Sequence, residues 1–231
     1  MKFFEPHESM KEFCKMSREY FYEGYQNIAR EANEWFGLSK LTPDSSILEF
    51  GGGEGFISVF LSKLTPAKFI YIDKNPHAAD LAHKNFEEAG MLCRSRLIVG
   101  EVEKTSFPDA SIDFIISRGT IQFTEYKKTL SNVVRWLKPG GIAFMGCGFG
   151  LDITDEYRAR VNEFIRIKEE EGINTESEKF DELVIEGYRH LIDNYFDDQL
   201  EYVKALNLTG FFFEIKKRRG AKHKKTEGAI S

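Results

Sequence analysis

A glycine-rich segment has the composition of a ligand-binding loop. It reads Glu49-Phe50-Gly51-Gly52-Gly53-Glu54-Gly55, and it lies between an apolar run and a helical pattern. Glycines let a backbone turn tightly and approach a ligand without a Cβ atom in between. A dinucleotide-binding turn has the spacing G-x-G-x-x-G, whereas this loop has G-x-G-x-G with Phe at position 56. The carboxylate of Glu49 suits a ligand with a cationic amino-acid end better than a pyrophosphate, which disfavours NAD.

Two further acidic residues follow the next two β-prone runs. Asp73 closes one run and Glu101 comes just after the other. A carboxylate at the first position can accept both hydroxyls of a ribose, and one at the second can accept from an adenine amino group. Taken singly, Asp73 also fits a turn or helix N-cap before Pro76, and Glu101 also fits a surface position. Together with Glu49 they indicate one crevice, because the carboxyl ends of parallel strands meet at one edge of a sheet.

Candidates for a substrate pocket follow the fourth and fifth runs. Arg118 can pair with a carboxylate or phosphate and Gln122 can hydrogen-bond a polar group, although both also fit a surface loop. Cys147 lies in the segment Gly146–Gly150, which fits either a close approach to a ligand or a hinge, and a small buried hydrophobe is the plainer interpretation of its side chain. No histidines pair at metal-ligand spacing and the three cysteines form no CxxC motif, so we expect no metal.

The elements that must position these residues are short apolar runs alternating with helical patterns. The runs are 47–50, 69–72, 96–99, 112–116 and 142–145. Their length and apolar character fit strands that are buried on both faces, as in a parallel sheet. Helical spacing fills the gaps at 56–64, 78–89 and 130–137. The alternation predicts a doubly wound α/β sheet.

The chain after the fifth run predicts two further features. Two β-prone runs, 199–206 and 211–216, flank a short connection that ends in Gly210 and predict an antiparallel hairpin. Residues 152–195 have helical spacing and are too long for a simple connection. We expect them to form a helical cap over the carboxyl ends of the strands, together with the aromatic residues of segment 8–37, including Tyr20, Tyr22 and Tyr25. A dimer interface is the alternative use of these helices.

Composition and charge narrow the class of protein. The chain has 231 residues, of which 42% are hydrophobic and 30% charged, as in a folded domain. No apolar run is long enough to span a membrane and the first residues do not resemble a signal peptide, so we expect a cytoplasmic protein. The formal net charge is −5, but residues 216–231 alone carry seven Lys/Arg and one acid. The rest of the chain is therefore strongly acidic, which makes nucleic acid an unlikely partner and a solvated basic tail the plainer interpretation.

These segments together resemble the class I S-adenosylmethionine-dependent methyltransferases, closest in pattern to the small-molecule branch of ubiquinone and menaquinone biosynthesis. The likeness covers residues 40–150 and rests on Ile47–Gly55, Ile72–Lys74, Gly100–Asp113 and Trp136–Gly141. It implies a seven-stranded, mainly parallel sheet with an antiparallel last strand. It also implies S-adenosyl-L-methionine as cofactor and S-adenosyl-L-homocysteine as product. The sequence lacks the (Asp/Asn)-Pro-Pro-(Tyr/Phe) and Pro-Cys motifs of the usual DNA-base methyltransferases at the matching place.

The resemblance also assigns cofactor positions, which in this chain are Glu49, Gly51, Gly52, Gly53, Gly55, Asp73, Lys74, Glu101, Val102 and Ser117. Glu49 and the backbone of Gly51 and Gly53 match the positions that hold the methionine part. Asp73 matches the ribose position, and Glu101 with Val102 matches the adenine position. The chain departs from the family pattern at Glu101, where Asp is usual, and at Gly52, where Cys or Ser is common.

The predicted activity is methyl transfer to a small molecule by in-line displacement in a capped pocket. A general base is needed only if the acceptor is protonated at neutral pH. The alternatives are a non-catalytic S-adenosylmethionine-binding protein and an RNA methyltransferase that uses the basic tail. The predicted organisation is an N-terminal helical segment or lid (1–39), a methyltransferase domain (40–218) with a helical insertion (152–195), and a basic tail (219–231). The protein is expected to be a monomer or a homodimer.

Overall fold

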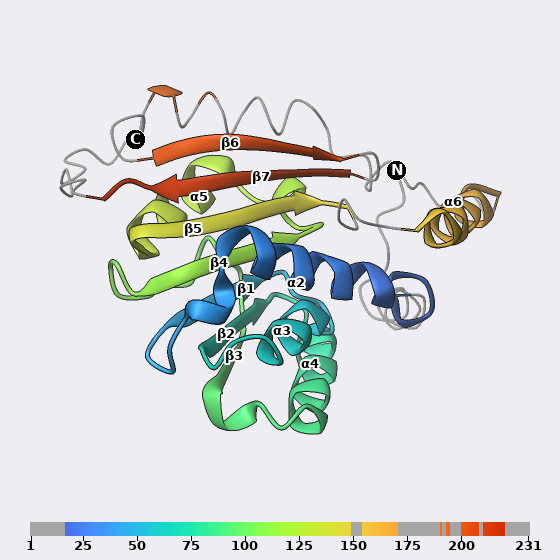
Figure 1. Ribbon diagram of the computed structural model, residues 1–231, viewed down its shortest axis with the longest axis horizontal. Coiled ribbons are helices and arrows are strands. Elements are labelled where there is room, and N and C mark those ends of the chain that lie inside the picture. Colours follow the sequence, from blue (N-terminus) through green and yellow to red (C-terminus); the bar gives the residue numbers. More distant parts are fainter. Residues whose placement is uncertain are drawn as a thin grey trace.

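The computed structural model describes residues 17–148, 154–170, 190, 193–194, 200–207 and 210–219. They form a seven-stranded sheet in the order β3-β2-β1-β4-β5-β7-β6, with helices on both sides (Figure 1). The mainly parallel α/β sheet predicted from the apolar runs is confirmed. Among the described residues, no helix is both long and apolar enough to cross a membrane.

Five strands make up the parallel part of the sheet: β1 (Ser46–Phe50), β2 (Lys68–Asp73), β3 (Ser95–Val99), β4 (Ile112–Arg118) and β5 (Leu137–Cys147). β1 pairs with β2 on one side and with β4 on the other. The order in which the chain lays down its strands therefore reverses between β1 and β4. Such a switch point leaves a crevice at the carboxyl ends of the two strands, where α/β sheets bind ligands.

The antiparallel part is the predicted hairpin. β6 (Leu200–Asn207) and β7 (Gly210–Lys217) pair with each other, and β7 also pairs with β5. The register places Phe211 beside Cys147 and Lys216 beside Ile142. The basic end of β7 therefore lies toward the amino end of β5, away from the crevice.

The helices cover the sheet in two layers. α2 (Tyr22–Phe36), α3 (Phe56–Ser62) and α4 (Pro76–Glu88) lie on one face, and α5 (Tyr126–Trp136) lies on the other (Figure 1). Successive side chains of a strand point to opposite faces. Accordingly, Ile47 packs in the apolar cluster under α2 and α3, while its neighbour Leu48 packs in the cluster under α5. Short helical turns occupy Ser17–Phe21 (η1), Leu38–Lys40 (η2), Leu92–Arg94 (η3) and Ile121–Phe123 (η4).

The fifth strand begins earlier than its apolar run predicts. The run covers 142–145, but α5 ends at Trp136 and β5 begins at Leu137, so Pro139-Gly140-Gly141 lie inside the strand. The pairing of β4 with β5 shifts register between Ile112 and Phe114, so the strand accommodates them as an irregularity. Lys217, which is buried, donates to the carbonyls of Val134 (2.6 Å) and Leu137 (2.8 Å) at the end of α5. A lysine from β7 therefore binds carbonyl groups at the C-terminal end of the helix.

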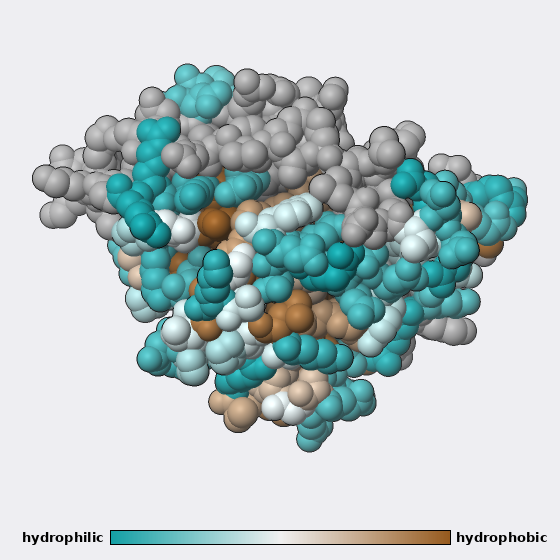
Figure 2. Space-filling model, in the orientation of Figure 1, coloured by the Kyte–Doolittle hydropathy of each residue, from teal (hydrophilic) through white to brown (hydrophobic). Residues whose placement is uncertain are grey.

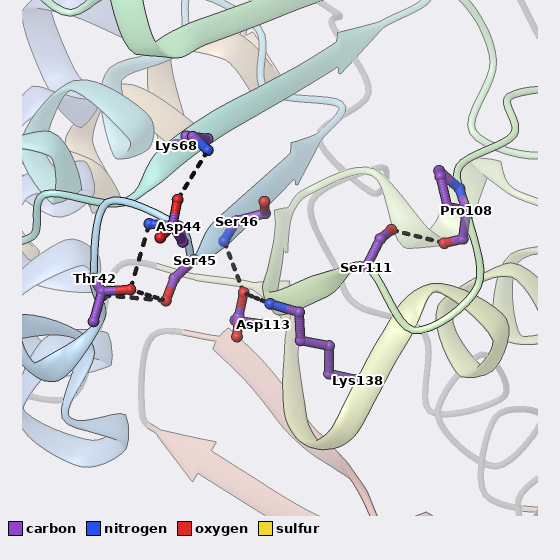
Figure 3. A network of polar contacts seen from close by, with 9 residues as sticks. All are labelled: Thr42, Asp44, Ser45, Ser46, Lys68, Pro108, Ser111, Asp113 and Lys138. Atoms are coloured by element: carbon purple, nitrogen blue, oxygen red, sulfur yellow. Dashed lines mark hydrogen bonds and ion pairs between the residues drawn. The ribbon is translucent and has the colours of Figure 1, made fainter.

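A polar network joins the strands at their amino ends (Figure 3). Asp113 accepts from the backbone N–H of Ser46 (2.8 Å) and from Lys138 Nζ (2.7 Å). These bonds link β1, β4 and β5 at the edge of the sheet opposite the crevice. The ammonium group of Lys138 thus balances the charge of Asp113, and the carboxylate supports the fold by linking these strands.

A third apolar cluster lies beside the carboxyl edge. Phe21 of η1 packs with Tyr157 and Phe164 of α6 (Asp155–Glu170). The side chains of Arg160 and Glu23 form an ion pair between α6 and the start of α2. The first part of the predicted cap is therefore a helix in contact with the N-terminal aromatic segment, while residues 171–189 and most of 190–199 lie outside the described residues. In Figure 2, hydrophilic residues cover most of the coloured part of the visible face, around smaller hydrophobic patches.

Candidate functional site

The glycine loop turns sharply between β1 and α3. Gly53 has a φ of +54°, and no atom lies within 4 Å of the place where its Cβ would be. A Cβ at Gly51 would instead lie 1.9 Å from Thr120 Oγ1. The loop is therefore packed against the end of β4 at Gly51 and open at Gly53, as a loop that contacts a ligand must be.

Tyr71 explains the departure from the family pattern at Gly52. A Cβ at Gly52 would lie 2.6 Å from Cε2 of Tyr71, so the aromatic ring fills the space of a side chain. Tyr71 is buried, and its hydroxyl donates to the carbonyl of Gly53. Sequence reasoning missed this role of Tyr71, although an aromatic residue two positions before Asp73 is a signal that the sequence contains.

Glu49 places a buried carboxylate directly under the loop. The residue is 2% exposed, and Oε2 accepts from both the backbone N–H (3.1 Å) and the hydroxyl of Ser58. Burial raises the pKa of Glu49 to about 7, with a smaller contribution from the charge of Asp73, while the two Ser58 bonds oppose the rise. An acid poised in this way is stabilised in its ionised form when a cation approaches.

Asp73 lies beside the same loop at the end of β2. Its Oδ2 accepts from the N–H of Gly53 (2.9 Å), and its Oδ1 accepts from the N–H of Asn75 (2.8 Å). Burial raises its pKa and the two N–H donors oppose that rise. The N-cap of α4 is Asn75, which accepts from His77 and Ala78. The helix N-cap interpretation of Asp73 is therefore wrong, although the residue does make a turn bond.

The remaining acidic candidate lies apart from this pair. Glu101 is exposed, and its Oε1 accepts from Lys104 Nζ at 2.7 Å, which lowers its pKa. Lys74, also exposed, lowers it further through its charge. Val102 is buried in the core cluster, and its carbonyl accepts from Asn132 (3.0 Å). The structure thus brings Glu49 and Asp73 together at the loop and leaves Glu101 on the surface.

The end of β4 holds the glycine loop from the other side. Ser117, which is buried, donates to the carbonyl of Phe50 (3.0 Å), and Thr120 donates to that of Gly51 (3.1 Å). Ser117 therefore supports the loop through its side chain. The sequence contains no local signal for Thr120 as a partner, because the two segments are 69 residues apart.

Arg118 joins the site to the N-terminal segment. Its Nε donates to the carbonyl of Gly148 (2.7 Å), and its guanidinium carbon lies 5.4 Å from the ring centre of Phe21 and 5.1 Å from that of Tyr25. Gln122 lies in η4 and Cys147 ends β5, but the side chains of both lie outside the described part of the structure. Of the three predicted pocket residues, only Arg118 can be placed in full.

Arg18 ties the N-terminal segment directly to the glycine loop. Its Nε lies 2.7 Å from Glu54 Oε1, and its Nη2 donates to Asn85 Oδ1 at 3.1 Å. The Glu54 side chain is 2% exposed, and burial raises its pKa while Arg18 opposes the rise. Sequence reasoning missed this pair.

No metal site accompanies these carboxylates in the part of the chain that the structure describes. No group of three or more His, Cys, Asp or Glu residues converges there.

Comparison with known proteins agrees with this geometry. Residues 47–141 match the family model described as a methyltransferase domain. The ubiquinone/menaquinone biosynthesis C-methyltransferase UbiE of Wigglesworthia glossinidia brevipalpis is 34% identical over 102 residues, which cover 43% of this chain and 41% of the relative. Protein arginine N-methyltransferase 8-B of Danio rerio is 25% identical over 145 residues, covering 55% of this chain and 34% of the relative. The chain spans about a third of the length of the arginine methyltransferases that it matches.

Solved structures extend the likeness to the whole fold. A candidate S-adenosyl-L-methionine-dependent methyltransferase from Methanococcus maripaludis superposes with a TM-score of 0.80 at 24% identity, covering 96% of this chain and 98% of the other. A SAM-dependent methyltransferase from Aquifex aeolicus gives 0.57 at 18% identity, with coverages of 93% and 98%. Residues 47–141 thus resemble a methyltransferase domain, and the chain shares its fold with solved S-adenosylmethionine-dependent methyltransferases.

Proposed function

We propose that the protein binds S-adenosyl-L-methionine at the β1–β4 crevice and transfers its methyl group to a small molecule. One observation carries the proposal: two carboxylates lie at the glycine loop, the buried one of Glu49 beside Gly52 and that of Asp73 bonded to the N–H of Gly53, whose Cβ position is open. These are the groups that an amino-acid end and a ribose need. When bound, the cofactor supplies a methyl group on a sulfonium centre, which is already activated for displacement.

The residues present fit such a ligand. Ser58 binds Oε2 of Glu49, and the negative charge of this side chain can accept a cationic amino group. Asp73 already accepts two N–H bonds, and a carboxylate has about four acceptor positions, so ribose hydroxyls can be added. Gly53 allows the ligand to lie against the backbone.

The N-terminal segment and α6 would close this site, as a lid over the domain. Tyr22 and Tyr25 of α2 contact Phe56 at the start of α3, directly after the glycine loop. Such a wall would exclude water and hold the acceptor in line with the methyl group. Arg118, held by Phe21 and Tyr25, is the residue we propose to orient the acceptor.

A small-molecule acceptor is favoured over RNA by the position of the basic residues. Lys216 pairs with Ile142 toward the amino end of β5, whereas the proposed site lies at the carboxyl edge. An RNA bound at residues 216–219 would lie several strand residues, about 15 Å or more, from the methyl group. The names of the relatives include acceptors as different as protein arginine and quinone precursors, so the acceptor itself has to be found by assay.

Calorimetric titration with S-adenosyl-L-methionine and S-adenosyl-L-homocysteine tests the proposed function. We expect binding with a Kd well below 1 mM. Glu49→Ala and Asp73→Ala should each weaken it by about 1–3 kcal/mol, the usual effect of losing a hydrogen bond to a charged group. Glu88→Ala, which removes an exposed carboxylate of α4, is the matched control and should leave the Kd unchanged.

Turnover distinguishes the enzyme from a non-catalytic binding protein. Incubation with cofactor carrying a labelled methyl group and a broad pool of metabolites should yield a labelled small molecule. Tight cofactor binding without any labelled product would favour the non-catalytic alternative, and no binding of either ligand below 1 mM would refute the proposed site.

A further inference from the structure

The carboxyl group of Glu49 is held by one residue of the described chain. Ser58, the third residue of α3, is fully buried, and it donates both its backbone N–H and its hydroxyl to the same oxygen, Oε2. No other hydrogen bond to this side chain is found among the described residues. The carboxyl group is thus fixed in orientation from the side of α3.

The surroundings of Glu49 oppose its ionisation. In the sheet its register partners are Tyr71 of β2 and Ile116 of β4, which are both buried. β2 carries Tyr71 and Asp73 at its carboxyl end and Lys68 at its amino end, and β4 carries Arg118 at its carboxyl end and Asp113 at its amino end. Arg18 and Glu54 lie beside the loop, and α2, which packs on α3, carries the buried Glu31. Arg18 is paired with Glu54 and Arg118 is held at Gly148. The donors of Ser58 are therefore the contacts that directly favour the charged form.

We propose that Ser58 is the positioning residue that keeps Glu49 able to accept the cationic amino group of the cofactor at neutral pH. The inference rests on the proposed function, because it requires that Glu49 binds this group. An N–H and an O–H donor stabilise a carboxylate and do not stabilise the neutral acid to the same extent. Ser58 would thus act through Glu49, without touching the cofactor.

The test is the pH dependence of S-adenosyl-L-homocysteine binding by the full chain, measured by calorimetry between pH 6 and 8. Loss of the Ser58 hydroxyl should move the pKa of Glu49 further upward from about 7. We expect Ser58→Ala to weaken binding about tenfold at pH 7, which is about 1.4 kcal/mol. The deficit should shrink as the pH rises, because Glu49 then ionises in the variant as well. Superimposable pH profiles of variant and wild type would overturn the inference.

Two further variants serve as controls, one at another serine of the same helix and one that keeps the hydroxyl at position 58. Ser62→Ala removes another serine hydroxyl from α3, one that donates to the carbonyl of Val59, and it should leave the profile unchanged. Ser58→Thr keeps the hydroxyl and should restore binding at pH 7. If Ser58→Ala does not fold, Ser58→Cys, which has a similar size and a weaker donor, provides the same comparison.

A double-variant cycle separates this inference from the proposed function. In a Glu49→Gln background, Ser58→Ala should have no further effect on the Kd, because its route of action is gone. An equal loss in both backgrounds and at every pH would show a purely structural role and overturn the inference. If Glu49→Gln weakens binding but Ser58→Ala does not, only the inference fails. If Glu49→Gln itself binds like the wild type, the proposed function fails with it.

Discussion

The two edges of the sheet hold their carboxylates in different ways. At the amino edge, Asp113 is bound by the ammonium group of Lys138 and by the N–H of Ser46. At the carboxyl edge, Glu49 and Asp73 are bound by neutral N–H and O–H donors, and neither takes part in an ion pair among the described residues. The first arrangement supports the fold, while the second leaves negative charge available for a ligand.

This difference has an energetic consequence. Burying a carboxylate without a cation costs free energy, and the protein responds through a raised pKa rather than through a salt bridge. Functional sites commonly retain such unfavourable groups at the expense of stability. Neutralising Glu49 at the carboxyl edge should therefore raise the free energy of unfolding at neutral pH, whereas neutralising Asp113 at the amino edge should lower it.

The largest effect should come from closing the space between the loop and β4. Gly51→Ala places a Cβ 1.9 Å from Thr120 Oγ1 at a φ of +63°. Overpacking and left-handed strain together should lower the free energy of unfolding by about 3–5 kcal/mol in urea denaturation. Gly53→Ala meets no atom within 4 Å, so it should cost only about 1–2 kcal/mol while abolishing cofactor binding. A Gly53→Ala variant with normal affinity would show that the ligand does not lie there.

Neutralising the two edges separately tests the comparison itself. Folding raises the pKa of Glu49 from 4.5 to about 7, so the native state binds more protons than the unfolded chain between these values. Stability should therefore fall by about 3 kcal/mol as the pH rises through this window, and Glu49→Gln should remove that slope. Asp113→Asn should instead lower stability and leave cofactor affinity unchanged. Thermal melts at pH 5 and 8 measure the stability of each variant. If the stability of Glu49→Gln still falls with pH as that of the wild type does, the raised pKa of Glu49 is not the cause.

Breaking the Arg18–Glu54 ion pair, which joins the N-terminal segment to the glycine loop, should have a medium effect. Arg18→Ala leaves the buried carboxylate of Glu54 without its cation, which should cost about 1–3 kcal/mol of unfolding free energy and weaken cofactor binding. Lys128→Ala breaks an exposed ion pair with Glu125 and should change stability by less than about 0.5 kcal/mol. Hydrogen exchange of residues 17–25 should accelerate in the first variant alone. Equal exchange in both would show that Arg18 does not fasten this segment.

The smallest effect is expected at Glu101. Its carboxylate is exposed and bound to Lys104, so Glu101→Gln should change the Kd for S-adenosyl-L-homocysteine less than Asp73→Asn does. We expect a change of less than about threefold, measured in the same titration. A loss as large as that of Asp73→Asn would show that Glu101 turns toward the adenine when the ligand binds.

Sequence reasoning located the strands and the two acidic residues at the loop, because apolar runs and strand ends are local features. The contacts that define the site are not local. Ser58 hydrogen-bonds Glu49 from the following helix. Thr120 bonds Gly51, which is 69 residues away in the sequence, and Arg18 bonds Glu54, which is 36 residues away. The early start of β5 has the same origin, because pairing with β4 extends the strand through Pro139-Gly140-Gly141, which locally favour a turn.

A crystal structure of the full chain with S-adenosyl-L-homocysteine tests the central claim most directly. The account predicts that the ligand lies along Gly51–Gly53, with its amino group within about 3.2 Å of a Glu49 oxygen and its ribose hydroxyls within the same distance of Asp73. A ligand bound elsewhere, or one whose amino group and ribose contact neither carboxylate, would contradict it.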